Sequence, residues 1–115
     1  MIFFYFVFLF FISKSFTASY VPGTEDVPLM NGMQPSTDSP TAFDSVQGRI
    51  VSAKTFVSEP REIIENFYDQ TLQNLGWAIK ISGKEYIRDK QILKIQINKK
   101  SNKNLEVSFE LTESK

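Results

Sequence analysis

The chain of 115 residues contains no cysteine and no histidine. Without cysteine it cannot form a disulfide framework, a thiol nucleophile, a thiolate metal site or a lipidated cysteine anchor. Without histidine it lacks the most common general base and the most common metal ligand, and a Ser-His-Asp arrangement is impossible. We therefore predict no catalytic residues, no metal site and no cofactor.

The chain also lacks an excess of charge of either sign, because its 13 basic residues balance its 13 acidic ones. A formal net charge of zero does not indicate a general attraction to nucleic acid. We therefore predict no nucleic-acid partner.

An unbroken apolar run occupies Met1–Ile12 and includes six phenylalanines. Small and polar residues follow it, among them Thr17 and Ser19. A short apolar core before small residues is typical of a secretory signal, and a spanning helix needs about 20 apolar residues. We predict a signal peptide over residues 1–19, cleaved after Ser19, and a periplasmic or secreted mature protein. The alternatives are an uncleaved inner-membrane anchor over residues 1–12 and a folded element.

Residues 20–47 are dense in proline and glycine and rich in small polar residues. Such residues oppose helices and long strands, so we predict an extended, irregular arm. The arm also carries apolar residues that a purely disordered segment would have in smaller number. We expect its stretch Asp26-Val27-Pro28-Leu29-Met30 to lie against the domain. The alternative is a flexible tether between the membrane and the domain.

Residues 48–115 carry the periodicities of one small domain. Apolar and polar residues alternate in Arg49–Val57, which predicts a strand. Apolar residues recur at helical spacing over Glu59–Leu75, which predicts an amphipathic helix. We expect Ser58 to cap the start of this helix and Gly76 to end it in a left-handed conformation.

Three further strands are predicted after the helix, at Trp77–Ile81, Leu93–Ile97 and Leu105–Leu111, because each of these segments alternates. Glu85–Arg88 extends the first of them or pairs with it. One apolar and one polar face on every strand indicates an antiparallel sheet that is covered on one side. The predicted fold class is α+β: a two-layer sandwich of one amphipathic helix on an antiparallel sheet, in the order β-α-β-β-β, with an irregular N-terminal arm.

Five short segments follow one another between Asp26 and Trp77: Asp26-Val27-Pro28-Leu29-Met30, Phe43-Asp44, Gly48-Arg49-Ile50-Val51, Phe67-Tyr68 and Leu75-Gly76-Trp77. Together they resemble a family of small exported alphaproteobacterial proteins without an assigned activity. The family pattern reads DVPLMPG, FD-x-x-x-GRIV, FY and LPQLGW, and this chain departs from it at Asn31 and Gln73, where the family has proline. The resemblance covers residues 26–77 and implies a bacterial origin and export.

Two carboxylates of the arm, Asp26 and Asp44, can act as an acid and a base only if they are held close together. The more ordinary roles are turn capping and, for Asp44, a charge pair with Arg49 that anchors the arm. Three aromatic residues are expected in the core between helix and sheet, and the alternative is a groove for an apolar or peptide ligand. These residues are Phe67, Tyr68 and Trp77.

A basic tract runs from Lys80 to Lys103, with eight basic residues against two acidic ones. We expect Lys80 and Lys94 on the outer face of the sheet, and Lys99 and Lys100 at the following turn. Such a surface can attract an anionic membrane or an acidic envelope polymer. The alternative is an ordinary solvated face on which lysine discourages edge pairing.

The sequence favours a non-catalytic, exported domain that binds an unknown protein of the cell envelope. The expected contact is through the arm, at Asp26, Leu29 and Met30, or through a sheet edge by strand addition. The alternative function is peripheral binding of an anionic membrane or polymer through the lysine-rich face. A hydrolase that uses the arm carboxylates is a third hypothesis.

Overall fold

The computed structural model describes residues 19–115. Residues 1–18, which hold nearly all of the predicted signal peptide, lie outside this range, so export and cleavage stay predictions. Within the described residues, no helix is both long enough and apolar enough to cross a membrane.

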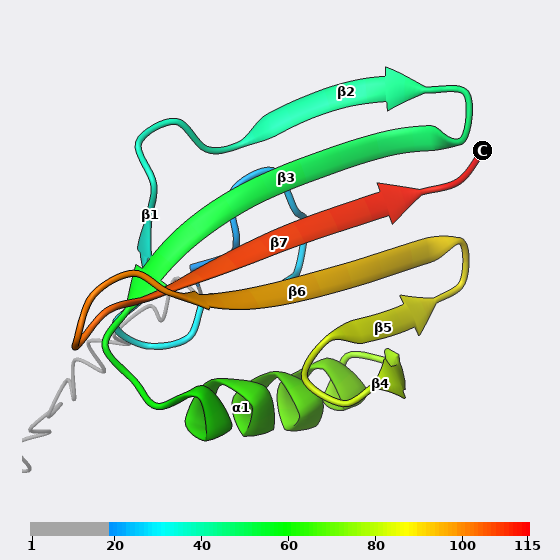
Figure 1. Cartoon of the computed structure of the whole chain (residues 1–115). Helices are drawn as coiled ribbons and strands as arrows, with labels where there is room; N and C mark the ends of the chain where they lie inside the picture. The colour runs from blue at the N-terminus through cyan, green and yellow to red at the C-terminus, as the bar shows by residue number, and fades with distance from the viewer. Residues whose placement is uncertain (1–18) are drawn as a thin grey trace, which may run out of the picture.

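Residues 19–115 form an α+β fold, with one helix packed on an open antiparallel sheet of seven strands (Figure 1). The strands lie in the order β1-β3-β7-β6-β5-β4, and β2 pairs with β3 beside β1. The elements in chain order are β1 (Gln34–Pro35), β2 (Thr41–Ser45), β3 (Gly48–Val57), α1 (Arg61–Asn74), β4 (Ala78–Ile81), β5 (Glu85–Arg88), β6 (Gln91–Lys99) and β7 (Leu105–Glu113).

The predicted order β-α-β-β-β is therefore wrong in two places. Glu85–Arg88 forms a strand of its own, β5, which the stated order omits; it pairs with β4, as one of the two predicted alternatives has it, and with β6. Two strands, β1 and β2, also lie within residues 20–47, where an irregular arm is predicted. The strand β2 forms because Thr41–Ser45, which contains neither proline nor glycine, folds back through a two-residue turn and pairs with β3.

The limits of α1 are close to those predicted, but its start is different. Pro60 is the N-cap with an extended ψ of 148° and without a side-chain capping bond, and the hydroxyl of Ser58 donates instead to Oδ1 of Asn104 at 2.6 Å. The predicted end is confirmed. Gly76 has φ 92°, and the N–H of Trp77 donates to the carbonyl of Leu72 at 2.9 Å, which closes the last turn.

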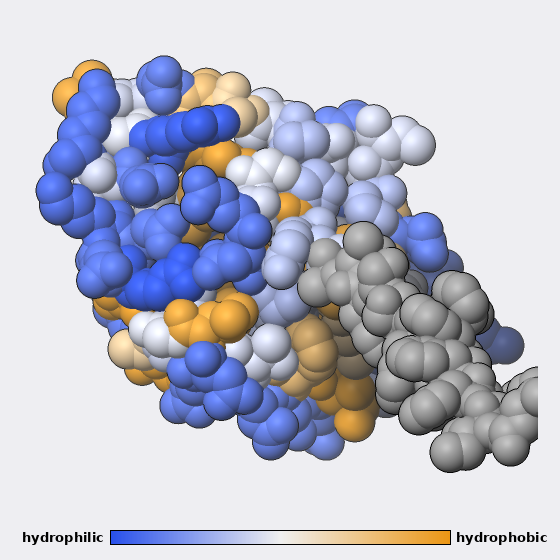
Figure 2. Space-filling model, turned by 180° about the vertical axis from the view of Figure 1, so that it is seen from behind, coloured by the Kyte–Doolittle hydropathy of each residue, from blue (hydrophilic) through white to orange (hydrophobic). Residues whose placement is uncertain are grey.

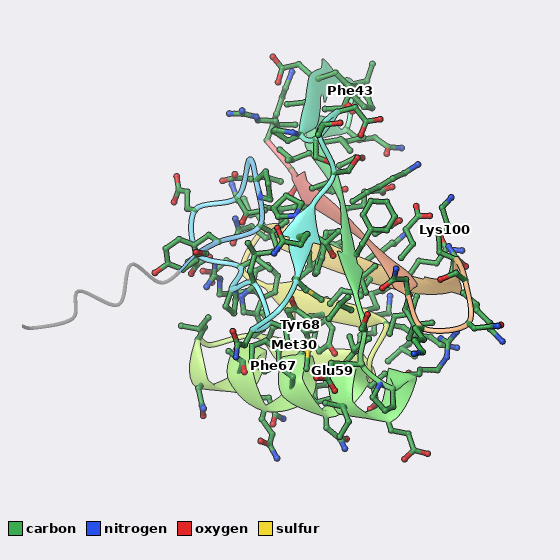
Figure 3. The ribbon with its side chains drawn as sticks, turned by 90° about the vertical axis from the view of Figure 1, so that its left-hand side faces the viewer. Met30, Phe43, Glu59, Phe67, Tyr68 and Lys100 are labelled. Atoms are coloured by element: carbon green, nitrogen blue, oxygen red, sulfur yellow. The ribbon has the colours of Figure 1, made fainter. Side chains whose placement is uncertain are left out.

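The core lies between one face of the sheet, α1 and the first part of the arm. Tyr68 is fully buried, makes edge contacts with Phe67 and Phe109, and donates its hydroxyl proton to the carbonyl of Pro28 at 2.8 Å. Figure 3 shows Met30, Phe67 and Tyr68 close together where the arm meets α1. The other buried core residues are Val21, Val27, Met33, Val51, Ala53, Val57, Ile64, Leu72, Trp77, Tyr86, Leu93, Ile95, Ile97, Val107 and Leu111.

The docked position of the arm confirms the expectation for residues 26–30, because Val27 is fully buried and Leu29 and Met30 pack against the core. In Figure 1 the arm passes behind β3 and β7. Seen from that side, the molecule presents hydrophilic residues with smaller apolar patches between them (Figure 2). The arm and α1 thus cover one face of the sheet and leave the other face open.

Candidate functional site

The arm is held by a charged cluster at the end of the covered face. Arg88 on β5 donates to both carboxylate oxygens of Asp26, at 2.7 and 3.0 Å, and to the carbonyl of Leu75 at 3.1 Å. Its guanidinium carbon lies 4.3 Å from the ring centroid of Trp77, which is a cation–π contact. The hydrogen bonds from Arg88 lower the pKa of Asp26, and the same bonds raise the pKa of Arg88.

The three predicted binding residues of the arm are therefore occupied within the protein. Asp26 is paired with Arg88, while Leu29 and Met30 lie against the core. The predicted pair Asp44 and Arg49 lie opposite each other in the register of β2 and β3, but the ion pair that anchors the arm is that of Asp26. The two arm carboxylates face different cations, so the structure does not bring them together as an acid and a base.

The lysine-rich face is balanced by glutamates. Lys80 pairs with Glu85 at 3.0 Å, and Lys100 pairs with Glu106 at 3.3 Å. Lys94 lies in register between Glu85 on one side and Glu110 on the other. Lys99 is exposed and lies opposite Leu105 on the neighbouring strand. The lysines therefore do not form one continuous face: Lys99 ends β6 instead of standing in the turn, and alternation along β6 places it on the other face of the sheet from Lys94.

A second carboxylate, Asp69 on α1, joins the helix to the turn between β4 and β5. It accepts hydrogen bonds from the hydroxyl of Ser82, the N–H of Gly83 at 2.9 Å and the hydroxyl of Tyr86 at 2.7 Å. Burial raises the pKa of Asp69, but the three donors outweigh it and the pKa is lowered. Burial and the neighbouring Asp69 raise the pKa of Tyr86. A stable carboxylate beside a neutral phenol fixes the helix position and is poorly suited to proton transfer near neutral pH.

A hollow of about 660 Å³ lies over the strands β3, β7 and β6 and reaches the start of α1. Its lining mixes both signs of charge, with Lys84 and Arg61 against Glu65 and Glu110. The arrangement has no dominant charge that selects one class of ligand. Within residues 19–115, no cluster of acidic residues has the arrangement of a metal site.

The open face carries an apolar row that crosses the sheet. Each member lies opposite the next in the strand register, so the row passes without a gap from one edge of the sheet to the other. Phe43 is 51% exposed and Ile92 is 37% exposed. The row consists of five apolar residues and one threonine, which are Phe43, Ile50, Thr112, Ile92, Ile87 and Ala78. This row cannot be predicted from the sequence, because each of its members lies on a different strand.

The row ends on β2, which is a free edge of the sheet. All five residues of β2 are exposed or half-exposed, and Phe43 lies at the end of the molecule remote from α1 (Figure 3). The strand contains no lysine and no proline, and its pairing with β3 has no register shift. Of the devices that protect an edge strand, β2 has a short length and the charge of Asp44, but it lacks lysine, proline and a bulge.

The opposite edge, β4, is protected. It has four residues, a register shift between Ile79 and Ile81, and Lys80 at its centre. The helix α1 also lies beside this strand. Bulges, lysine and a covering helix each discourage the addition of another strand. The two edges of the sheet are thus unequal, and β2 is the one that is open to a partner.

Fold and surface together define a small α+β domain with one covered face, one open face and one edge that is less protected than the other. Comparison with protein-family models, with curated proteins and with solved structures gives no match to this chain.

Proposed function

We propose that this chain is an exported, non-catalytic protein of the bacterial cell envelope that binds another protein by adding one of its strands to β2. The observation that carries this proposal is the contrast between the edge β2, which lacks lysine and a bulge, and the edge β4, which has both and a helix beside it. The apolar run at Met1–Ile12 and the resemblance to exported alphaproteobacterial proteins support the location outside the cytoplasm. The mature protein is then periplasmic or secreted, or it stays on the inner membrane through residues 1–12.

In this proposal the fold has two layers. The sheet is one layer, and α1 with the docked arm is the other. The open face is thereby left free beside β2, so that a strand added to β2 enlarges both faces of the sheet.

The added strand is bound in two ways. Its backbone pairs with the free N–H and C=O groups of β2, which supplies affinity for any extended segment. Its alternate side chains continue the cross-strand rows, so the residue that meets Phe43 extends the apolar row of the open face. The proposed partner segment is therefore extended, with an apolar residue opposite Phe43.

The alternative function, binding of an anionic membrane or polymer through lysines, has less support. Lys80 and Lys100 are ion-paired, and Lys94 lies between two glutamates in the register. A face of alternating charges attracts a polyanion weakly, and salt screens the remaining electrostatic attraction.

The test is co-purification of the tagged full chain, co-expressed with an untagged copy of the same chain, from a detergent-solubilised envelope at high salt. Two substitutions are matched, because Phe43 on β2 is 51% exposed and Ile81 on β4 is 49% exposed. The proposal expects a stoichiometric protein partner with the native chain and with Ile81→Asp, and loss of that partner with Phe43→Asp. A partner that stays with Phe43→Asp and leaves with Ile81→Asp would contradict it.

A further inference from the structure

We infer that the strand that adds to β2 is the β2 strand of a second copy of this chain, so that the protein forms a two-fold dimer with Phe43 at the symmetry axis. This inference rests on the proposed function, because it uses the same edge, and it names the partner.

The backbone of β2 has the right groups free for this pairing. Two residues, Val46 and Gln47, form the turn to β3, so Ser45 and Gly48 close the hairpin as a hydrogen-bonded pair. In an antiparallel ladder such pairs alternate with non-bonded ones. Phe43 therefore shares its backbone groups with β3, whereas the residues on either side of it turn their N–H and C=O groups away from the sheet. These residues are Ala42 and Asp44.

Three registers would let this short strand pair with its own copy about a two-fold axis. An axis at Asp44 places two aspartates opposite each other, and like charges in that position are destabilising. An axis at Ala42 brings Asp44 opposite Pro40, which has no N–H to donate. An axis at Phe43 avoids both the repulsion between aspartates and the missing N–H group, because Asp44 of each copy then lies opposite Ala42 of the other.

The register with Phe43 on the axis also fits the side chains. The two Phe43 residues form a non-hydrogen-bonded pair, the kind in which opposing side chains lie closer together. Aromatic pairs in this position stabilise antiparallel strands. The pair also joins the apolar rows of the two copies into one row, from Ala78 of one copy to Ala78 of the other. The exposed side chain of Phe43 is thus covered by Phe43 of the second copy.

The absence of cysteine allows this register to be tested residue by residue. Full-length chains that carry one introduced cysteine are expressed in cells and treated with a mild oxidant. In the inferred register the two Cα atoms at position 43 are about 4.5 Å apart, which a disulfide can bridge. The two atoms at position 42 are diagonal neighbours about 7–8 Å apart, which a disulfide does not bridge without backbone movement.

We expect Phe43→Cys to form a disulfide-linked dimer of twice the chain mass, and Ala42→Cys to remain a monomer. Because Phe43→Cys removes the aromatic pair, a second test keeps Phe43 in place: Ala42→Cys chains co-expressed with Asp44→Cys chains should form the mixed dimer. Ile81→Cys on the protected edge is the matched control and should not cross-link.

Three results would overturn the inference: no cross-link from either Phe43→Cys or the mixed pair, equal cross-linking by Ala42→Cys alone, or equal cross-linking by Ile81→Cys. A different result is that cross-links are absent while the chain still captures another protein in a manner that depends on Phe43. That result refutes only the inference that the partner is a second copy of the chain. If both are absent, the proposed function fails as well.

Discussion

Arg88 reaches back across 62 positions of the sequence to bind both carboxylate oxygens of Asp26, at 2.7 and 3.0 Å. This ion pair ties the arm to β5, and the ring of Trp77 supports the guanidinium from the other side. The consequence is that the arm belongs to the covered face, where its Val27 is part of the core. The arm is therefore a structural part of the domain, and the sheet edge β2 is the surface that we propose for binding.

Arg88→Met should loosen the arm. Arg88 is largely shielded and Asp26 is 38% exposed, so we expect a loss of about 1–2 kcal/mol in the free energy of unfolding after allowance for solvent screening. Urea denaturation measures this value, and limited proteolysis reports whether the arm is released. Lys80→Met is the control, because that lysine is well exposed and should change stability by less than about 0.5 kcal/mol. Equal effects of the two substitutions would refute the anchoring role.

The Asp26 pair should also make stability depend on acid pH. The pKa of Asp26 is lowered in the folded state by Arg88, so its contribution is present above the unfolded pKa of about 3.9 and is lost as pH falls through the folded value. Asp26→Asn removes this dependence and leaves that of Asp69, whose pKa is also lowered. Unfolding measured from about pH 5 to about pH 2 should show a smaller loss of stability for Asp26→Asn than for the native chain. An equal loss of stability in the two proteins over this pH range would contradict the assignment of the pH dependence to Asp26.

The sequence predicts the parts of the fold whose periodicity is strong. Ile64, Tyr68 and Leu72 are buried at the helical spacing expected of α1, and Gly76 ends the helix as predicted. The sequence does not predict β2, because a five-residue strand between Pro40 and a turn has no period of its own. It forms because the turn brings it against β3, which is a tertiary effect on a weak local signal.

The surroundings of the lysines and the apolar row are harder to predict from the sequence, because both depend on which strands pair. The basic tract between Lys80 and Lys103 shows a large positive surplus in the sequence, but Glu106 and Glu110 on β7 lie outside that stretch and are brought beside the lysines by strand pairing. The apolar row has the same property, since its members are far apart in the sequence. Spacing along one strand indicates which face a residue occupies, whereas neighbours across strands depend on register.

Gly48 should tolerate no side chain. Its φ is 135°, in the region that favours glycine. An added Cβ would lie 2.1 Å from the carbonyl oxygen of Glu113, which is a backbone atom and cannot rotate away as a side chain can. We expect Gly48→Ala to lower the free energy of unfolding by about 2 kcal/mol or more. Gly32 is the control, with φ 90° but open space around its Cα, so Gly32→Ala should cost only about 1 kcal/mol of backbone strain. Chemical denaturation of both variants gives the comparison, and similar losses would contradict the close approach.

The balanced charges of the lysine face predict weak selection for anionic lipid. The full chain should associate to a similar extent with neutral vesicles and with vesicles containing anionic lipid at physiological salt, because the glutamates neutralise much of the local field. Vesicle co-sedimentation measures this. Replacing both Lys94 and Lys99 with glutamine should leave the result unchanged. Binding that requires anionic lipid, falls as salt rises and is lost on these substitutions would restore the lysine-rich face as the functional surface.

The most direct test of the account is amide hydrogen exchange on the full-length protein in its native assembly. The N–H groups of Ala42 and Asp44 point away from β3, so in a free edge they exchange rapidly with solvent. If β2 receives a strand, both amides should be protected at least about tenfold relative to the Phe43→Asp variant, with no change at Ile81 on the other edge. Rapid exchange at both amides while the assembly is intact would contradict strand addition at β2.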